Sequence, residues 1–385
     1  FLVALLLIAA NLRPSITGVG PLLATIQEDL GLSAAAAGWL ASLPILMFAG
    51  FAPLAGLARR HGAERMLLVG LLAIVAGILL RSEGHAIELF AGTAILATGI
   101  ACANVLLPVV IKQRYPQRVP GITTAYATIM GAFAALASGI AVPVANLMPG
   151  GWRASLASWA LPAAIALALW LPHARHAPRK APAVAPGPAR ATQSPWRTPV
   201  AWQITGFMGL QSTIFYVAIS WFPAILTEHG FSPVAAGWLL TVFQVAALLA
   251  GLAVPPLMRR FHDQRALAVS TSALYGLGVL GILVAPAGAG LWMVLLGCGG
   301  GPSLILALSF IGLRAHSPRS VTSLSLMVQS LGYLIAALGP VAFGLLHDHT
   351  GGWAVGMLGL IAVAILQALC GLGAGRTGVA ATSGR

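Results

Sequence analysis

The stretch Gly31-Leu-Ser-Ala-Ala-Ala-Ala-Gly-Trp-Leu40 occurs again as Gly230-Phe-Ser-Pro-Val-Ala-Ala-Gly-Trp-Leu239, with seven of ten positions identical. Three shorter matches keep the same order along the chain, at offsets of 199 to 201 residues. They pair Arg59, Arg60 and Arg65 with Arg259, Arg260 and Arg265; Ile111 and Arg114 with Ile311 and Arg314; and Gly150-Gly151-Trp152 with Gly351-Gly352-Trp353. Matches that keep their order indicate that the chain arose by duplication of one unit.

The composition excludes a soluble globular protein. Of the 385 residues, 58% are hydrophobic and only 8% are charged, whereas an ordinary soluble domain has roughly half and a quarter. The mean hydropathy of +0.91 makes the membrane span of about 20 residues the relevant unit of structure. The chain is long enough for twelve such spans.

Apolar runs bounded by charged residues, Pro or Gly predict six helices in each copy of the repeat. In the first copy the helices are expected at 1–27, 34–58, 66–82, 87–112, 120–147 and 153–172. In the second copy they are expected at 199–227, 233–258, 266–286, 289–313, 320–346 and 353–374. An even number of helices makes the repeats parallel, as in major facilitator transporters. The predicted fold is an all-α membrane protein with 12 transmembrane helices in two parallel six-helix halves.

The two predicted bundles, 1–172 and 199–374, are joined by a linker at 173–198 and followed by a tail at 375–385. From Pro172 to Pro199 the chain has seven prolines and five basic residues but no acidic residue. Such a segment buries too little apolar surface to order itself. We therefore expect an extended cytoplasmic linker.

The basic residues predict the orientation, because Lys and Arg beside short loops stay on the cytoplasmic side. With both termini inside, 18 of the 21 Lys and Arg residues fall in cytoplasmic segments and two fall outside, which leaves Arg13. The first apolar run is too long for a signal-peptide core and has no A-x-A exit, so we expect a mature span. Because the chain begins at Phe1 rather than Met, we also expect a trimmed start. The expected location is a bacterial inner membrane, with both termini cytoplasmic.

Arg13 lies deep in the first predicted helix, 12 residues after Phe1 and 15 before Glu28, which is about 20 Å from either end. A charge at this depth costs about 3 kcal/mol or more unless something compensates it. All acidic residues and histidines lie at helix ends or in loops. The predicted partner is therefore a substrate anion or an electron-rich substrate oxygen, which a guanidinium binds through its fork of N–H groups. The alternative is a structural Arg bonded to backbone carbonyls, because Pro14 frees the carbonyl of Ala10.

Nine other polar side chains lie near the middle of predicted helices and are candidate substrate contacts. For each of them the alternative is a hydrogen bond between helices, the commoner role of a lone Gln or Tyr in a membrane. Asn104 and Gln329 rank first, because helices 1, 4, 7 and 10 of this fold surround the central cavity and helices 5, 8 and 11 complete its wall. The nine are Asn11, Asn104, Tyr126, Gln211, Tyr216, Gln244, Ser303, Gln329 and Tyr333.

No motif of an enzyme or a cofactor protein is found. Gly276-Leu-Gly-Val-Leu-Gly281 matches G-x-G-x-x-G, but it lies inside an apolar span with no preceding strand, so it predicts helix packing. Gly299-Gly-Gly-Pro302 lacks the Lys-Ser/Thr of a phosphate loop and indicates a flexible or closely packed helix. Cys102, Cys298 and Cys370 lie singly in apolar runs, which predicts neither disulfides nor a metal site. We expect no enzymatic activity, no cofactor and no nucleic-acid partner.

Five segments carry a family signature: Asn11-Leu-Arg-Pro14 with Gly18-Val-Gly-Pro-Leu-Leu23, Ala58-Arg-Arg-His-Gly-Ala-Glu-Arg65, Asn104-Val-Leu-Leu-Pro108 with Ile111-Lys112, Ser220-Trp-Phe-Pro-Ala224, and Gln329-Ser-Leu-Gly-Tyr333. They resemble the cyanate transporter and 2-nitroimidazole transporter family of the major facilitator superfamily, and look closer to the 2-nitroimidazole branch. The resemblance implies an inner-membrane transporter of small polar or anionic solutes. It fixes neither the solute nor the direction of transport.

The loop after the second predicted helix departs from the general superfamily pattern G-x-L-A-D-R-x-G-R-R. Alignment on Arg60 and Gly62 puts Arg59 where that pattern has its aspartate. Glu64 is the candidate replacement for the missing anion, and a solvated loop charge is the alternative. The predicted loop motif consists of Arg59, Arg60, Gly62, Glu64 and Arg65.

The predicted function is secondary transport by alternating access, in which 1–172 rocks against 199–374 about a midplane site. Without an intramembrane carboxylate or histidine, we expect facilitated transport or exchange rather than carboxylate-relayed proton symport. One alternative is a multidrug/proton antiporter, although Val142 stands where the helix 5 motif of such antiporters needs Gly. The other is a non-transporting receptor or interaction protein. The expected partners are a small anionic or polar substrate and membrane lipid, with the chain as a monomer.

Overall fold

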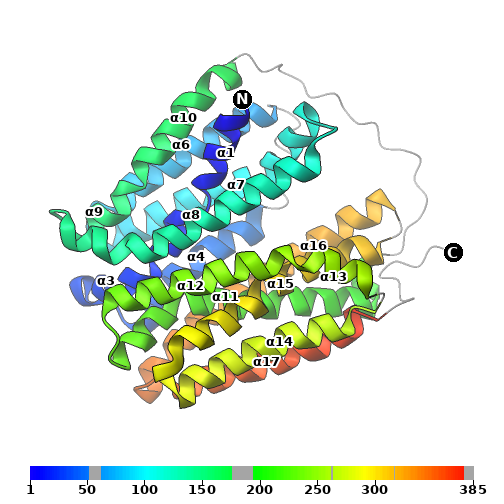
Figure 1. Cartoon of the computed structure of the whole chain (residues 1–385). Helices are drawn as coiled ribbons and strands as arrows, with labels where there is room; N and C mark the ends of the chain where they lie inside the picture. Colours follow the sequence, from blue (N-terminus) through cyan, green and yellow to red (C-terminus); the bar gives the residue numbers. More distant parts are fainter. Residues whose placement is uncertain (52–61, 176–193, 262, 316, 377–385) are drawn as a thin grey trace. The chain divides into compact units, whose positions relative to one another are not determined.

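The computed structural model of the chain describes residues 1–51, 62–175, 194–261, 263–315 and 317–376. Every regular element in these ranges is a helix (Figure 1). Eleven helices are long and apolar enough to cross a membrane, and a twelfth apolar helix, Ala34–Gly50, is shorter within the described residues. The predicted all-helical architecture with twelve membrane helices is confirmed.

Contacts along the chain define two compact units, of which the first contains the described residues of 1–32, 43–185 and 232–241. The sequence predicts that its first membrane segment is a single helix. The structure corrects this prediction, because the segment is a series of short helical pieces. The elements of this unit are α1 (Leu2–Ala10), α2 (Pro14–Thr17), η1 (Gly20–Leu22), α3 (Leu23–Leu30), α6 (Ala63–Arg81), α7 (Ala86–Arg114), α8 (Val119–Leu147), α9 (Gly151–Ser158) and α10 (Ala160–Arg175).

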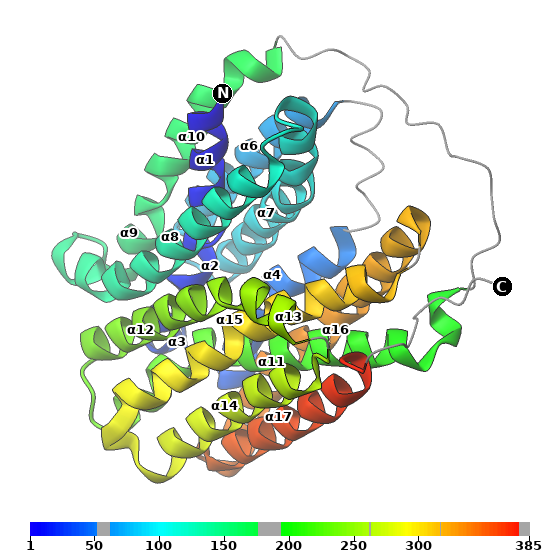
Figure 2. The ribbon, with the colours of Figure 1, turned by 45° about the vertical axis from the view of Figure 1, so that its right-hand side comes forward.

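The second unit contains the described residues of 33–42, 186–231 and 242–385. Its elements are η3 (Pro195–Arg197), α11 (Pro199–Glu228), α13 (Val254–Arg260), α14 (Arg265–Val284), η4 (Pro286–Gly288), α15 (Ala289–Arg314), α16 (Pro318–Thr350) and α17 (Ala354–Ala374). Within it α11 packs against α15, α16 and α17, and α14 lies beside α15 and α17 (Figure 2).

Two helices are divided between the units. The start of α4 (Ala34–Phe51) belongs to the second unit and the start of α12 (Pro233–Leu252) belongs to the first. The two exchanged segments, 33–42 and 232–241, are 199 residues apart. The exchange therefore follows the repeat that the sequence shows.

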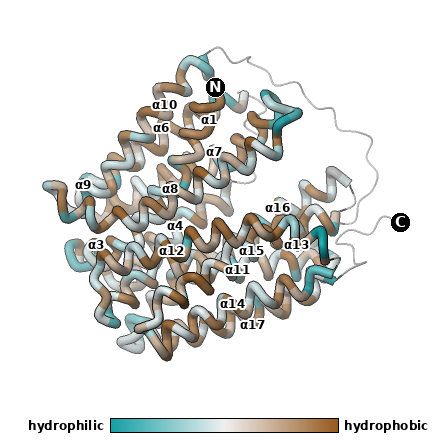
Figure 3. The backbone as a smooth tube through the Cα atoms, viewed as in Figure 1, coloured by the Kyte–Doolittle hydropathy of each residue, from teal (hydrophilic) through white to brown (hydrophobic). Residues whose placement is uncertain are grey.

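The distribution of apolar residues fits a chain surrounded by lipid. Apolar residues run along the helices, and hydrophilic residues gather at helix ends and connections (Figure 3). Large apolar side chains are exposed, among them Ile87 at 81%, Leu147 at 83% and Leu161 at 68%. Apolar surface on this scale is unfavourable in water, whereas the hydrocarbon of a bilayer solvates it.

Helices α6 and α7 approach closely through glycines. A Cβ atom at Gly70 would lie 3.1 Å from the carbonyl oxygen of Gly99, and one at Gly77 would lie 2.5 Å from that of Gly92. Small residues let helix backbones come together where apolar burial does not drive association. The same device accounts for the G-x-G-x-x-G stretch, because Gly278 and Gly281 in α14 leave no room for a Cβ against α15.

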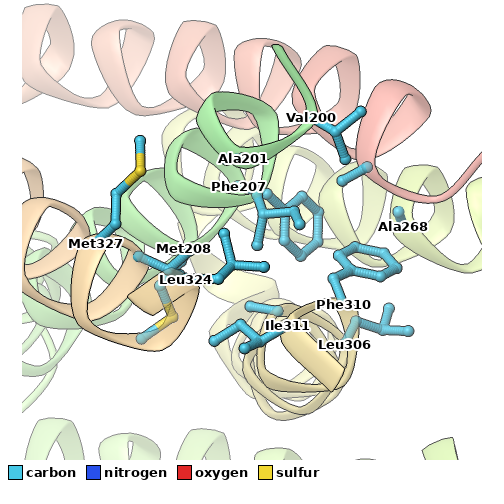
Figure 4. Packing of buried hydrophobic residues seen from close by; sticks show 14 of the residues in the cluster. Val200, Ala201, Phe207, Met208, Ala268, Leu306, Phe310, Ile311, Leu324 and Met327 are labelled. Carbon is cyan, nitrogen blue, oxygen red and sulfur yellow. The ribbon is translucent and has the colours of Figure 1, made fainter. Parts of the chain in front are cut away.

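The apolar core of the second unit lies where α11, α14, α15 and α16 meet (Figure 4). At its centre the rings of Phe207 and Phe310 pack edge to face, with centroids 5.6 Å apart. Such a pair contributes about 0.5–1.5 kcal/mol beyond its buried area. Leu306 and Ile311, from the same helix as Phe310, lie next to it.

The repeated Gly-Gly-Trp motif makes the same contact in both units. Nε1 of Trp152 donates to the carboxylate of Asp29 at 3.1 Å, and Nε1 of Trp353 donates to Glu228 at 2.6 Å. Asp29 and Glu228 are themselves 199 residues apart. The duplication thus extends to side-chain contacts that join the first and last membrane helices of each copy.

Candidate functional site

The first membrane segment breaks at Arg13, the residue that the sequence singles out. Helix α1 ends at Ala10, and α2 begins at Pro14 with Arg13 in the N-cap position. Pro14 has no N–H, so it cannot bond to the carbonyl of Ala10. The equivalent helix of the second copy, α11, continues unbroken for 30 residues. The interruption therefore belongs to the first copy.

Arg13 lies at the start of α2 and beside α8. Its carbonyl oxygen accepts the N–H groups of Ile16 and Thr17 at 2.9 and 3.0 Å, and the residue is half-buried. The charge of its guanidinium acts on the phenol of Tyr126 in α8, also half-buried. The structure thus brings together two of the predicted substrate residues, from segments more than a hundred positions apart in the sequence.

Hydrogen bonds to α8 hold α2 in place. Oγ1 of Thr17 donates to the carbonyl of Ala134 at 2.9 Å, and Oγ of Ser138 donates back to the carbonyl of Thr17 at 3.1 Å. Both bonds are buried. In a low-dielectric interior such bonds are hard to break, so they hold the backbone of α2, from which the side chain of Arg13 extends, against α8.

Asn11 closes the end of α1. Its side chain is 3% exposed, and Nδ2 donates to the carbonyls of Leu7 at 2.7 Å and Pro162 at 3.2 Å. Asn11 therefore ties α1 to α10, which is the interhelical role that we consider as the alternative for each polar candidate. A substrate contact of Asn11 stays a prediction.

Arg81 is a buried charge that sequence reasoning missed. The sequence places Arg81 at the outer end of the third predicted helix, 66–82, without a sign of burial, whereas the structure makes it the last residue of α6 and buries it completely. Its Nη1 donates to the carbonyl of Ser15 at 2.6 Å. That carbonyl is available because the N–H of Val19 bonds to Ile16 instead. Only the tertiary structure reveals this partner.

Two glutamines of the second unit bond within their own helices. Gln211 of α11 is 3% exposed, and its Nε2 donates to Oγ of Ser212 at 2.6 Å. Gln329 of α16 is half-buried, and its Nε2 donates to Oγ of Ser325 at 2.7 Å. These bonds hold the side chains near their own backbones, and a substrate role for either residue stays a prediction.

Ser303 lies in a contact between helices. Its side chain on α15 is completely buried and accepts a hydrogen bond from Nε2 of Gln367 on α17 at 3.0 Å. Gln367 is also completely buried, and it was not among the predicted residues. A polar residue in the last membrane helix is the signal that would have found this pair.

The remaining candidates lie in four different helices. Tyr216 on α11 and Gln244 on α12 are 3% and 6% exposed, whereas Asn104 on α7 and Tyr333 on α16 are half-buried. Asn104 belongs to the first unit and the other three to the second. Asn104 and Tyr333 keep more exposed surface than Tyr216 and Gln244, and a substrate role for any of the four stays a prediction.

Glu64 in the predicted loop motif forms an ion pair. Its Oε1 lies 3.1 Å from Nη2 of Arg114, so the start of α6 is joined to the end of α7. Gly62 precedes α6 with φ of 86°, in the left-handed region that favours glycine. Arg65 is half-buried near the start of α6, and Arg59 and Arg60 lie outside the described residues.

The equivalent loop of the second copy carries a different ion pair. The carboxylate of Asp263 lies 2.6 Å from Nη2 of Arg265. This hydrogen bond lowers the pKa of Asp263 from its ordinary value. The pair is exposed to solvent, so it contributes little to stability.

The described residues contain no group of three or more His, Cys, Asp or Glu side chains placed to hold a metal ion. The tri-glycine stretch on α15 is a packing feature, since a Cβ at Gly300 would lie 2.6 Å from the hydroxyl of Tyr275 and Gly301 lies directly against Ala247. The prediction that these glycines lie in a closely packed helix is therefore confirmed.

Comparison with known proteins places the chain in a family. The family model of the Major Facilitator Superfamily matches residues 5–340. The chain belongs to the major facilitator superfamily. It is a multi-pass membrane transporter and not an enzyme, as the sequence predicts. Among solved structures, this transporter shares its fold with a D-xylose–proton symporter at a TM-score of 0.79 and 13% identity, over 96% of this chain and 95% of that one.

Three relatives narrow the comparison. The transporter is 43% identical over 373 residues to the 2-nitroimidazole transporter of Escherichia coli (strain K12), covering 97% of this chain and 94% of that protein. It is 42% identical over 376 residues to the uncharacterized transporter YycB of Bacillus subtilis (strain 168), covering 97% and 92%. Identity to the cyanate transport protein CynX of E. coli is 30% over 355 residues, covering 91% of each chain. The predicted resemblance, closer to the 2-nitroimidazole than to the cyanate branch, is confirmed.

Proposed function

We propose that this transporter moves a small anionic or polar solute, similar to cyanate or a nitroimidazole, across the inner membrane by alternating access, and that Arg13 binds the solute. The observation that carries the proposal is the half-buried Arg13 at the break between α1 and α2, beside Tyr126. A guanidinium and a phenol together offer several N–H and O–H donors to electron-rich oxygens.

The relatives support the class of solute. The names of two relatives contain the solutes 2-nitroimidazole and cyanate. Both solutes are small, polar and rich in acceptor atoms. A guanidinium binds such acceptors through parallel N–H groups. The same guanidinium costs about 3 kcal/mol or more inside a membrane, so a bound solute that accepts its hydrogen bonds offsets part of this cost.

The division of the chain into two bundles, 1–172 and 199–374, belongs to the same proposal. In alternating access one bundle rocks against the other around the bound solute, while the linker at 173–198 follows the motion. The interrupted first helix supports such a motion, because a helix made of short pieces bends at lower cost than a continuous one.

The positions of the acidic residues favour facilitated transport or exchange. Among the described residues, every carboxylate lies within two residues of a helix end or in a connection: Glu28, Asp29, Glu64, Glu83, Glu88, Glu228, Asp263 and Asp348. A proton relay through the membrane usually needs a carboxylate or histidine in the span. We expect proteoliposomes to carry solute without a fixed proton stoichiometry, and a strict stoichiometry abolished by replacing one acidic residue would contradict this.

The role of Arg13 is tested by solute uptake into proteoliposomes. Arg13→Gln is expected to abolish uptake of cyanate or 2-nitroimidazole, and Arg13→Lys to retain part of it, because Lys keeps the charge but loses the fork of N–H groups. Arg153→Gln is the matched control, since Arg153 lies in the same unit and is ion-paired with Asp29 at 2.7 Å. Uptake in folded Arg13→Gln equal to that of the control would refute the proposal.

A further inference from the structure

The guanidinium of Arg81 has two nitrogens without a partner. The side chain is completely buried, Nη1 donates to Ser15, and Nε and Nη2 are buried with no hydrogen-bond partner among the described residues. A buried donor without an acceptor is unfavourable, because it has given up its hydrogen bonds to water. Such a group in a folded protein calls for a ligand, an ion or a water.

The two unpartnered nitrogens form one edge of the guanidinium. The N–H of Nε and one N–H of Nη2 run parallel, at a spacing that matches the two oxygens of a planar O–X–O group. The bond to Ser15 uses the remaining nitrogen. Arg81 therefore keeps a complete bidentate edge open, which a Lys at this position would not provide.

No carboxylate compensates the charge of Arg81. All eight acidic residues of the chain are described, and none forms an ion pair with Arg81 within 4.0 Å. A buried cation without a counter-charge is strongly destabilising. Charged residues inside membrane proteins mark solute paths for this reason.

Arg81 acts on the same short helix as Arg13. Arg13 forms the N-cap of α2, and Arg81 bonds to Ser15, the second residue of that helix. Helix α2 and the turn η1 are short pieces interrupted at Gly18. A shift of these pieces would uncover the edge of Arg81 without unfolding a long helix.

We propose that Arg81 is a second binding residue for the transported solute, and that it takes a planar anion, such as a carboxylate or nitrate, through Nε and Nη2. The proposal rests on the function proposed above and narrows its solute class to compounds with a planar O–X–O group, which the nitro group of 2-nitroimidazole has and linear cyanate lacks. In the conformation described here the edge is closed by protein. A shift of α2 and η1 admits the anion, which supplies both the missing acceptors and the missing negative charge.

The test is thermal unfolding of the full-length purified protein in sodium salts at equal ionic strength. Benzoate and nitrate should raise the melting temperature saturably, and chloride, which is spherical, should not. In Arg81→Lys the concentration of benzoate at half effect should rise at least tenfold, whereas Arg153→Lys should keep the wild-type value. A structural role of Arg81 alone would lower the melting temperature without moving this concentration.

The outcomes separate this inference from the proposed function. The role of Arg81 is overturned if the half-effect concentration of benzoate is unchanged in Arg81→Lys, or if the wild type does not respond selectively to benzoate and nitrate. In either case, solute uptake that still depends on Arg13 would leave the proposed function standing. If Arg81→Lys does not fold, a structure of the wild type with 4-iodobenzoate decides. Carboxylate oxygens bound at Nε and Nη2 support the inference, and water or no density there overturns it.

Discussion

Replacement of Asp348 should loosen the start of α4. The two oxygens of its carboxylate accept the N–H groups of Ala34 and Ala35, the first two residues of that helix, at 3.0 and 2.8 Å. The N–H groups of a first turn have no partner within the helix. Asp348 therefore supplies acceptors for two of them and places negative charge at the positive end of the helix dipole.

The magnitude follows from the two bonds. A hydrogen bond to a charged group contributes about 1.5–3 kcal/mol, but Asp348 is exposed, which puts each bond at or below the lower end of this range. Asp348→Asn keeps one acceptor and loses the charge, so the local free energy of opening should fall by about 1 kcal/mol. Asp348→Ala loses both bonds, for about 2 kcal/mol.

Hydrogen exchange of a peptide covering residues 31–40 measures this change. A loss of about 1 kcal/mol speeds exchange through local opening roughly fivefold, and the effect of the charge should shrink in high salt. Glu83→Gln, the same change at another exposed carboxylate, should leave the peptide unchanged. Equal exchange in wild type and Asp348→Ala would refute the reasoning.

The comparison of the two copies explains why a carboxylate like that of Asp348 occurs in only one of them. The equivalent position, 200 residues earlier, is Met148, and the helix equivalent to α4 is α12, which begins with Pro233. Pro has no N–H to cap, so α12 needs one acceptor fewer in its first turn. Oγ of Ser232 accepts the N–H of Ala235 at 3.2 Å.

Two further predictions concern stability. Gly301→Ala should destabilise the second unit by about 1–3 kcal/mol through overpacking, because the new Cβ would collide with the carbonyl oxygen of Ala247. Gly312→Ala should not destabilise it, because no atom of the described residues lies within 4 Å of the new Cβ. Equal melting temperatures of the two variants would contradict this prediction. Arg114→Gln should destabilise by about 1–3 kcal/mol, because it leaves the carboxylate of Glu64, a residue only 6% exposed, without its partner. The double variant with Glu64→Gln should recover part of the loss, and simple additivity in a double-mutant cycle would show that the pair is not coupled.

The fold could be predicted from the sequence because its signals are local or repeated. Hydropathy locates the spans, and ten residues such as Gly31 to Leu40 are enough to align the two copies. The break of the first helix was only partly predictable. Pro14 marks the lost hydrogen bond, but the interruption at η1 lies where Gly18 approaches Ala137 of α8, a contact that the sequence does not reveal.

The partners of polar side chains were harder to predict, because they depend on which helices meet. Arg81 follows an apolar run and precedes Ser82 and Glu83, which is the pattern of a helix end next to a loop. Its burial becomes understandable only when the broken first helix presents the carbonyl of Ser15. Asn11 likewise gives no sign in the sequence that its amide reaches α10.

The two Trp–carboxylate contacts have a consequence for how the chain can be divided. In each copy the hydrogen bond joins the first membrane helix to the last, and α1 packs against α10 as α11 does against α17. In each copy the first and last membrane helices are therefore held together by contacts that do not pass through the linker. Two polypeptides that are divided within 173–198 and expressed together should then assemble into a working transporter, in which each unit takes one segment, 33–42 or 232–241, from the other half.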